Sequence, residues 1–123
     1  MGDYKQLIAY QKAFNLAIDI FNVTKSFPSE EKYGLTSQIR RASRSVCANL
    51  AEAYKRRMYK DYFISKLNDC ETKNTETQVW LAFALAFNYI DESNHQDLTK
   101  RNNEVGKLIW YMIHNPEKFS INK

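Results

Sequence analysis

Glycine and proline are scarce in this chain of 123 residues, which contains three glycines and two prolines. Because these two residue types mark most turns, their scarcity disfavours a sheet of many short strands and favours a few long helices. A charged fraction of 26% and a hydrophobic fraction of 44% are typical of a globular protein rather than a disordered one. The length is that of one domain, so we expect residues 1–123 to form a single domain.

Long hydrophobic runs are also missing from the sequence. The longest run, from Val79 to Phe87, is about half as long as a membrane-spanning helix requires. The first residues, from Met1 to Gln6, are polar and lack the apolar core of a signal peptide. We therefore expect a cytoplasmic protein that has no membrane partner.

Cysteine and histidine, which are frequent metal ligands, occur only twice each. Cys47 and Cys70 lack C-x-x-C spacing and fall within helical patterns, so we interpret them as small buried residues. Glu92 and His95 have the E-x-x-H spacing of di-iron bundles, but that site needs the motif twice, and His114 has no matching glutamate. The sequence therefore predicts neither a metal site nor a cofactor.

No pattern of catalytic residues is visible in the sequence either. A Ser-His-Asp triad needs a base, an orienting group and an oxyanion hole, which a tight glycine-rich turn usually supplies. A glycine-rich phosphate-binding loop is likewise absent from the sequence. We therefore name no catalytic residue, and we expect that the protein is not an enzyme.

Apolar residues recur at helical spacing in four segments of the chain. The four predicted helices span residues 4–25, 30–56, 59–89 and 94–114. Ser29, which precedes two glutamates, and the S-x-x-Q sequence that begins at Ser93 are typical helix starts. Because the connections between these segments are short, the sequence predicts an all-α fold, an antiparallel up-down-up-down four-helix bundle.

The apolar residues also predict which face of each helix points inward. On the first helix, the predicted face contains Tyr4, Leu7, Phe14, Ile18 and Phe21, and it is widened by Ala9, Ala13, Ala17 and Ile20. The second helix has a regular seam at alternating steps of four and three residues, formed by Leu35, Ile39, Ala42, Val46, Asn49 and Ala53. Asn49, a polar residue in this seam, and Glu52 are interpreted as structural polar residues that fix the packing register.

The third and fourth predicted helices carry more aromatic residues than a single bundle needs for its core. Large exposed apolar patches are rare on monomers and usually mark subunit interfaces. We therefore predict a homo-oligomer, and the candidate interface residues are Trp80, Phe83, Phe87, Trp110 and Tyr111. The alternative is that loops or the chain ends cover these rings.

Positive charge is concentrated in one part of the sequence. Residues 29–57 contain seven basic and three acidic residues, which accounts for the whole net charge of +4. The candidate nucleic-acid-binding residues on the second helix and the turn after it are Arg40, Arg41, Arg44, Lys55, Arg56, Arg57 and Lys60. These cations could contact phosphates of RNA or DNA, cap the helix end, or bridge subunits. The alternative function is a protein scaffold or accessory subunit that binds no nucleic acid.

Several short motifs occur in an order that resembles a known protein family. The motifs are FPSEEKYGL from Phe27 to Leu35, QIRRA from Gln38 to Ala42, and SVCANLAE from Ser45 to Glu52. This order is similar to that of the four-helix-bundle proteins encoded in intervening sequences of bacterial 23S rRNA genes, also labelled S23-type ribosomal proteins. The chain departs from the family pattern at Ala53, where glycine is usual, and at Thr72-Lys73, where a Gly-Ser pair is typical.

The resemblance implies a homopentamer of antiparallel bundles that has no known enzymatic activity and no settled biological role. A similar bundle is the accessory protein of diversity-generating retroelements, a basic pentamer thought to engage nucleic acid and a reverse transcriptase. The resemblance therefore implies RNA, DNA or another protein as a partner. The departures at Ala53 and Thr72-Lys73 concern helix termination and close packing rather than the fold.

Overall fold

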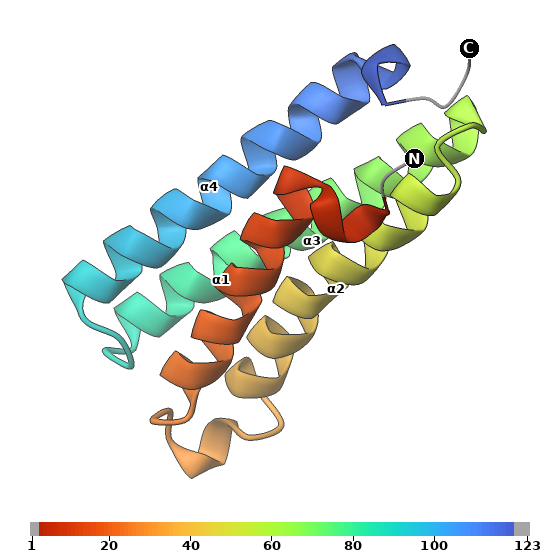
Figure 1. Cartoon of the computed structure of the whole chain (residues 1–123). Coiled ribbons are helices and arrows are strands. Elements are labelled where there is room, and N and C mark those ends of the chain that lie inside the picture. Colours follow the sequence, from red (N-terminus) through yellow and green to blue (C-terminus); the bar gives the residue numbers. More distant parts are fainter. Residues whose placement is uncertain (1–2, 120–123) are drawn as a thin grey trace.

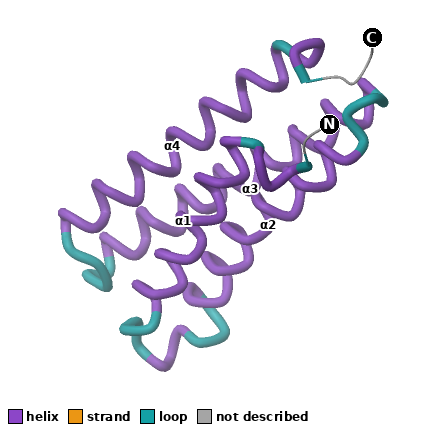
Figure 2. The backbone as a smooth tube through the Cα atoms, viewed as in Figure 1, coloured by secondary structure: helices purple, strands orange, loops and turns teal. Residues whose placement is uncertain are grey.

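The structure is a computed structural model, and it describes residues 3–119. Four helices dominate this part of the chain (Figure 1): α1 (Ile8–Thr24), α2 (Leu35–Lys55), α3 (Lys60–Ala86) and α4 (Glu92–His114). Three short 3-10 turns accompany them, namely η1 (Tyr4–Gln6), η2 (Ser29–Glu31) and η3 (Pro116–Lys118). Residues 3–119 contain no strand (Figure 2), so the prediction of an all-α four-helix bundle is confirmed.

The helices form a closed arrangement in which each one packs against two neighbours. Helix α1 contacts α2 and α4, and α3 also contacts α2 and α4. Successive helices run in opposite directions, because each connection joins them at one end of the bundle (Figure 1). The α2–α3 connection lies at the same end as η1 and the end of α4, which places these three segments near one another.

The buried face of α1 differs from the prediction. The face that packs into the core consists of Ala9, Ala13, Leu16, Ala17 and Ile20. The aromatic and branched residues Phe14, Ile18 and Phe21 are exposed instead, with 43% to 45% of their surface accessible. The prediction is therefore wrong for Phe14, Ile18 and Phe21, and the burial of Ala9, Ala13, Ala17 and Ile20 agrees with it.

The seam predicted on α2 is confirmed. Leu35, Ile39, Ala42 and Val46 are buried, as is Ala53 at the far end, while Asn49 is half-buried. On α3, the large apolar residues Phe63, Leu67 and Leu81 are also buried. At roughly 1.5–3 kcal/mol for each large side chain removed from water, this core supplies the main drive for folding.

Helix α2 begins at Leu35, five residues later than the predicted start. Ser29 begins only the short turn η2, and Glu31 caps the helix from a distance: its Oε1 accepts a hydrogen bond from the Leu35 backbone N at 2.9 Å. Gly34 makes room for this contact, because a Cβ at that position would lie 2.7 Å from the same carboxylate oxygen. The other carboxylate oxygen of Glu31 accepts a hydrogen bond from the Tyr89 hydroxyl at 2.9 Å, and this contact raises the pKa of Tyr89.

Boundaries of the other three helices also differ from the predicted ones. Helix α1 begins at Ile8 rather than at residue 4, because η1 is a separate turn that Asp3 caps. Helix α3 begins at Lys60 and ends at Ala86, close to Asn88, whose φ of 64° is left-handed and tolerated best by glycine and asparagine. Helix α4 begins at Glu92, because Asp91 accepts a hydrogen bond from the Asn94 backbone N at 2.7 Å. The predicted S-x-x-Q capping box is therefore wrong.

Two buried asparagines connect α3 and α4 at the middle of the bundle. Asn74 Nδ2 donates to the backbone O and the side-chain Oδ1 of Asn102, at 3.1 and 3.0 Å. Asn102 Nδ2 in turn donates to the backbone O of Asn74 and to Gln78 Oε1, both at 3.0 Å. Gly106 gives Asn74 the room for this arrangement, since a Cβ there would lie 2.8 Å from Asn74 Oδ1. These asparagines thus serve the packing of the core.

Candidate nucleic-acid interface

The seven candidate basic residues lie in two groups rather than in one patch. Arg40, Arg41 and Arg44 lie in the first half of α2. The other four surround the α2–α3 turn: Lys55 ends α2, Arg56 is its C-cap, Arg57 follows in the turn, and Lys60 begins α3. The groups face different neighbours, so each is described by its own contacts.

Arg40 supports the fold by closing the C-terminal end of α1. Its Nε donates to the Thr24 hydroxyl oxygen at 2.7 Å, and Nη2 donates to the backbone O of Phe21 at 3.4 Å. The guanidinium carbon also lies 4.3 Å from the centre of the Phe21 ring, a cation–π geometry. Because its donors already serve α1, Arg40 is poorly placed to bind a phosphate.

The two neighbouring arginines are more accessible. Arg41 is exposed, and Arg44 is exposed as well, although its Nε donates to the backbone O of Arg40 at 3.2 Å. Both arginines therefore keep charge available at the surface of α2.

At the α2–α3 turn, one arginine caps the end of α2, and the other cations are accessible to solvent. Arg57 Nη1 donates to the backbone O of Tyr54 at 2.8 Å, and its guanidinium carbon lies 3.9 Å from the centre of the Tyr54 ring. The Arg56 guanidinium carbon lies 5.8 Å from the centre of the Tyr62 ring. Lys55, Arg56 and Lys60 are all exposed.

None of the seven candidates forms an ion pair with a carboxylate within residues 3–119. The ion pairs of this part of the chain use other cations, for example Arg101 with Asp19 of α1 at 2.8 Å and Lys73 with Glu76 at 3.3 Å. Within the described residues, the cations of the α2–α3 turn therefore remain outside the network of close ion pairs.

Asn49 and Glu52 meet at one lysine of α3. Lys66 Nζ donates to Asn49 Oδ1 at 3.3 Å and lies 3.0 Å from Glu52 Oε1 and 3.6 Å from Asp69 Oδ2. The hydrogen bond to Glu52 is the main reason why the pKa of Lys66 is raised. The interpretation of these two residues as structural is consistent with this contact, because it ties α2 to α3.

The five candidate interface residues do not form one surface. Phe83 and Phe87 are exposed near the end of α3, and their rings lie 5.6 Å apart. Trp110 and Tyr111 are exposed near the end of α4, which lies at the opposite end of the bundle (Figure 1). Trp80 packs partly against the core, and its indole Nε1 is buried without a hydrogen-bond partner among residues 3–119.

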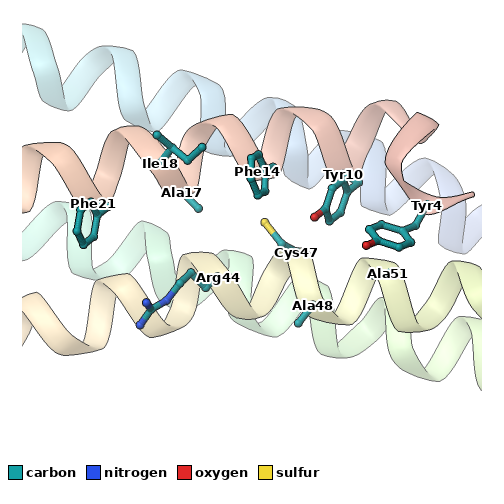
Figure 3. A pocket seen from close by; sticks show the side chains of 10 residues that line it. All are labelled: Tyr4, Tyr10, Phe14, Ala17, Ile18, Phe21, Arg44, Cys47, Ala48 and Ala51. Carbon is teal, nitrogen blue, oxygen red and sulfur yellow. The ribbon is translucent and has the colours of Figure 1, made fainter.

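The sequence analysis missed an apolar groove between α1 and α2, which is shown in Figure 3. Its volume is about 510 Å³. Aromatic and branched side chains of η1 and α1 form one wall, and the small residues Ala48 and Ala51 of α2 form the other, beside Arg44 and Cys47. Phe14, Ile18 and Phe21 are the residues in the sequence that could have indicated the groove, but the helical pattern predicts them in the core.

Features of catalysis or metal binding do not emerge from the described residues. Within residues 3–119, no three His, Cys, Asp or Glu side chains are grouped so that they could hold a metal ion. Cys47 and Cys70 are free thiols and buried, as predicted, and burial raises the pKa of the Cys47 thiol to about 11. His95 Nε2 lies 3.3 Å from the Thr99 hydroxyl oxygen, within α4. No helix in this part of the chain is long and apolar enough to cross a membrane.

Comparisons with known proteins agree with this architecture. The family model described as 23S rRNA-intervening sequence protein matches residues 5–111. A solved structure from Bacteroides thetaiotaomicron, described as a protein with unknown function from the S23 ribosomal protein family, is 28% identical in sequence, with a TM-score of 0.80. The match covers 87% of this chain and 96% of that chain. No curated protein matches this chain. Because the family model covers most of the chain and the solved structure shares its fold, the chain belongs to the family of 23S rRNA-intervening sequence proteins.

Proposed function

We propose that this protein is a non-enzymatic, homo-oligomeric bundle that binds the phosphate backbone of RNA or DNA through the α2–α3 turn. The observation that carries the proposal is the set of exposed cations Lys55, Arg56 and Lys60, which lie within six residues and have no carboxylate partner in residues 3–119. Unpaired surface cations gathered in this way attract phosphates and release their counterions.

The ends of the two helices reinforce this charge. Helix α3 begins at Lys60, and its N-cap residue Tyr59 makes no side-chain hydrogen bond, so its positive dipole end faces the same region. Asp61 in the first turn offsets part of this positive charge. The negative dipole end of α2 is partly offset, because Arg57 donates to a carbonyl of its last turn. A phosphate at the turn would therefore meet both formal and partial positive charges.

Oligomerisation strengthens binding by this modest patch. One subunit offers only a few phosphate contacts, and each is weak at physiological salt. A ring of identical subunits repeats the patch at fixed spacing, so that several weak contacts act together. The exposed rings on α1, α3 and α4 supply apolar area for such contacts between copies. A homopentamer, the assembly implied by the family resemblance, would present five such turns.

The experiment is a titration of labelled RNA and DNA with the purified protein at several salt concentrations. We expect the logarithm of the binding constant to fall linearly with the logarithm of salt concentration, by about 0.7 to 0.9 per phosphate contact. The double substitution Lys55→Glu/Arg56→Glu should weaken binding more than tenfold and lower this slope by about 2. Light scattering of the same samples measures the number of subunits.

A matched control is available on α4. Lys100 and Lys107 are exposed and lie outside the turn, so Lys100→Glu/Lys107→Glu makes the same change of charge elsewhere. Equal losses of affinity in the two double variants would show that net charge, and not the turn, determines binding. Absence of binding by the native protein at low salt would refute the proposal, and a monomer in light scattering would refute its oligomeric part.

The groove between α1 and α2 favours a second function, that of a scaffold for another protein. An apolar groove with one wall of small residues can hold the apolar side of a partner helix. If this function applies, Phe14→Ser/Ile18→Ser should abolish binding of the partner protein without changing the salt-dependent titration. The same variant should retain the native subunit number, because loss of the oligomer would assign the groove to contacts between copies instead.

A further inference from the structure

A second groove lies at the end of the bundle that carries the exposed cations Lys55, Arg56 and Lys60. It is lined by Tyr4 of η1, by Tyr62 of α3, and by Ala51, Glu52, Lys55 and Arg56 of α2, and its volume is about 350 Å³. Three elements therefore contribute to one site, and η1 is distant in sequence from the other two. This volume falls within the range of pockets that accept small organic ligands.

The two tyrosines offer accessible aromatic surface. Tyr62 is 41% exposed, and Tyr4 is half-buried. The ring of Tyr4 packs edge to face against that of Tyr10, with the ring centres 4.9 Å apart. Tyr10 in turn stacks on Phe14 at 5.8 Å, which is the row of rings visible in Figure 3. A ring fixed by its neighbours loses little freedom when a flat ligand stacks on it.

Each of these rings has a cation beside it. Lys5 Nζ lies 6.0 Å from the centre of the Tyr4 ring, and the Arg56 guanidinium carbon lies 5.8 Å from that of Tyr62. Lys55 adds a further exposed positive charge at the edge of the groove. Aromatic rings interleaved with cations are what an unpaired nucleotide requires, since its base stacks while its phosphate pairs with positive charge.

The single carboxylate among the residues that line the groove does not cancel this charge. Glu52 lies 3.0 Å from Lys66 Nζ, so its negative charge is already matched by a lysine of α3. The groove therefore keeps the net positive character of Lys55 and Arg56. This balance favours an anionic ligand over a cationic one.

We infer that this groove binds an unpaired nucleobase of a single-stranded nucleic acid between Tyr4 and Tyr62, with the adjacent phosphate on Lys55 and Arg56. The inference rests on the proposed function and deepens it, because phosphate contacts alone do not distinguish one strand from two. In a duplex the base faces are covered by neighbouring bases. Only an unpaired segment, or the end of a strand, can place a base against the two rings.

The test compares a labelled single-stranded RNA of mixed sequence with its duplex form by fluorescence anisotropy, using the full chain. Tyr62→Leu keeps an apolar side chain but removes the ring, and we expect it to weaken single-strand binding by about tenfold or more. Tyr4→Leu, on a different element, should have the same effect, while Tyr62→Phe should bind like the native protein. Duplex binding should change less than twofold in all three variants.

Tyr33→Leu is the matched control, because Tyr33 is 86% exposed and lies at the opposite end of the bundle, in the α1–α2 connection. The inference would be overturned if the native protein bound both RNA forms equally and neither Tyr4→Leu nor Tyr62→Leu changed this binding. If Lys55→Glu/Arg56→Glu still abolished binding in that case, the phosphate-binding proposal would remain intact. Absence of all binding at low salt would refute both. If Tyr62→Leu instead lowers the subunit number in light scattering, the groove belongs to a contact between copies, and the inference is also wrong.

Discussion

Replacing Asn102 by leucine should destabilise the bundle markedly, although leucine is nearly the same size and the site is in the core. The Asn102 side chain takes part in three hydrogen bonds: one from Asn74 Nδ2 to Oδ1, and two from Nδ2 to Asn74 O and Gln78 Oε1. Asn102 is 2% exposed, so water cannot replace these partners in place. The substitution removes all three bonds and leaves the Asn74 amide with the Asn102 carbonyl alone.

At about 0.5–1.5 kcal/mol for each hydrogen bond, the loss is roughly 2–4 kcal/mol in the free energy of unfolding. For a chain of this length, 1 kcal/mol corresponds to about 4 °C, so we expect the melting temperature to fall by about 10 °C. Thermal and urea unfolding followed by circular dichroism measure this change. All samples need the same protein concentration, because subunit association alters apparent stability.

Asn103→Leu is the control, because Asn103 is the exposed neighbour on the same helix. The double variant Asn74→Leu/Asn102→Leu removes both partners, and it should recover about 1 kcal/mol or more relative to the sum of the single changes. If Asn102→Leu and Asn103→Leu unfold at the same temperature, or if the double variant shows no coupling, the buried asparagine pair does not stabilise the fold.

Three further predictions concern packing, capping and pH. Gly106→Ala should lower the melting temperature even though alanine favours helix by about 1 kcal/mol, because its Cβ would displace the Asn74 side chain; a rise in the melting temperature would refute this. Arg40→Met should cost about 1–3 kcal/mol, since it removes the hydrogen bonds that close α1, and urea unfolding checks this. Burial raises the pKa values of Cys47 and Cys70 to about 11 and about 12. The unfolded chain therefore loses these protons first as pH rises above about 9, and the free energy of unfolding should fall by roughly 1 kcal/mol per thiol per pH unit; replacing both cysteines by alanine should flatten that part of the profile.

The helical period was sufficient to predict the bundle, because four segments repeat apolar residues in a way that only helices bury. It was insufficient on α1, where two apolar stripes compete for the core. One stripe is rich in alanine and the other contains Phe14, Ile18 and Phe21, and the helical pattern predicts both as parts of one wide buried face. The structure buries the alanine stripe, since close approach of the backbones depends on the neighbouring helices and not on the local sequence.

The start of α2 shows a second limit of local patterns. Ser29 with two following glutamates has the composition of a helix start, yet the helix begins only at Leu35. The cap comes from Glu31 through space, and Gly34 provides the room. A residue in one turn that caps the helix after it has no fixed spacing from the start of that helix. Sequence patterns therefore locate such a helix start poorly.

The sequence predicted which basic residues make up the candidate site, but not which of them bind helix carbonyls and which remain exposed. Arg40 and Arg57 belong to the same set of basic candidates as Lys55, Arg56 and Lys60, and nothing in the sequence predicts which of them the fold uses. The separation comes from the tertiary structure, because the end of α1 lies beside Arg40 and the ring of Tyr54 lies beside Arg57. The groove formed by Tyr4 and Tyr62 joins η1 to α3 across more than fifty residues, so no local motif could reveal it.

The structure thus divides the basic residues into those that the fold uses and those that it does not. Arg40 and Arg57 each satisfy helix carbonyls, and their charge also suits the negative ends of the helices that they close. Within residues 3–119, the side chains of Lys55 and Lys60 satisfy no helix carbonyl. The Arg56 guanidinium lies over the ring of Tyr62, which is itself exposed. Like charges held close together at one end of a bundle repel one another and do not stabilise it. These exposed charges support the proposal that the turn binds an anionic partner, and the two tyrosines beside them favour a partner that is also flat.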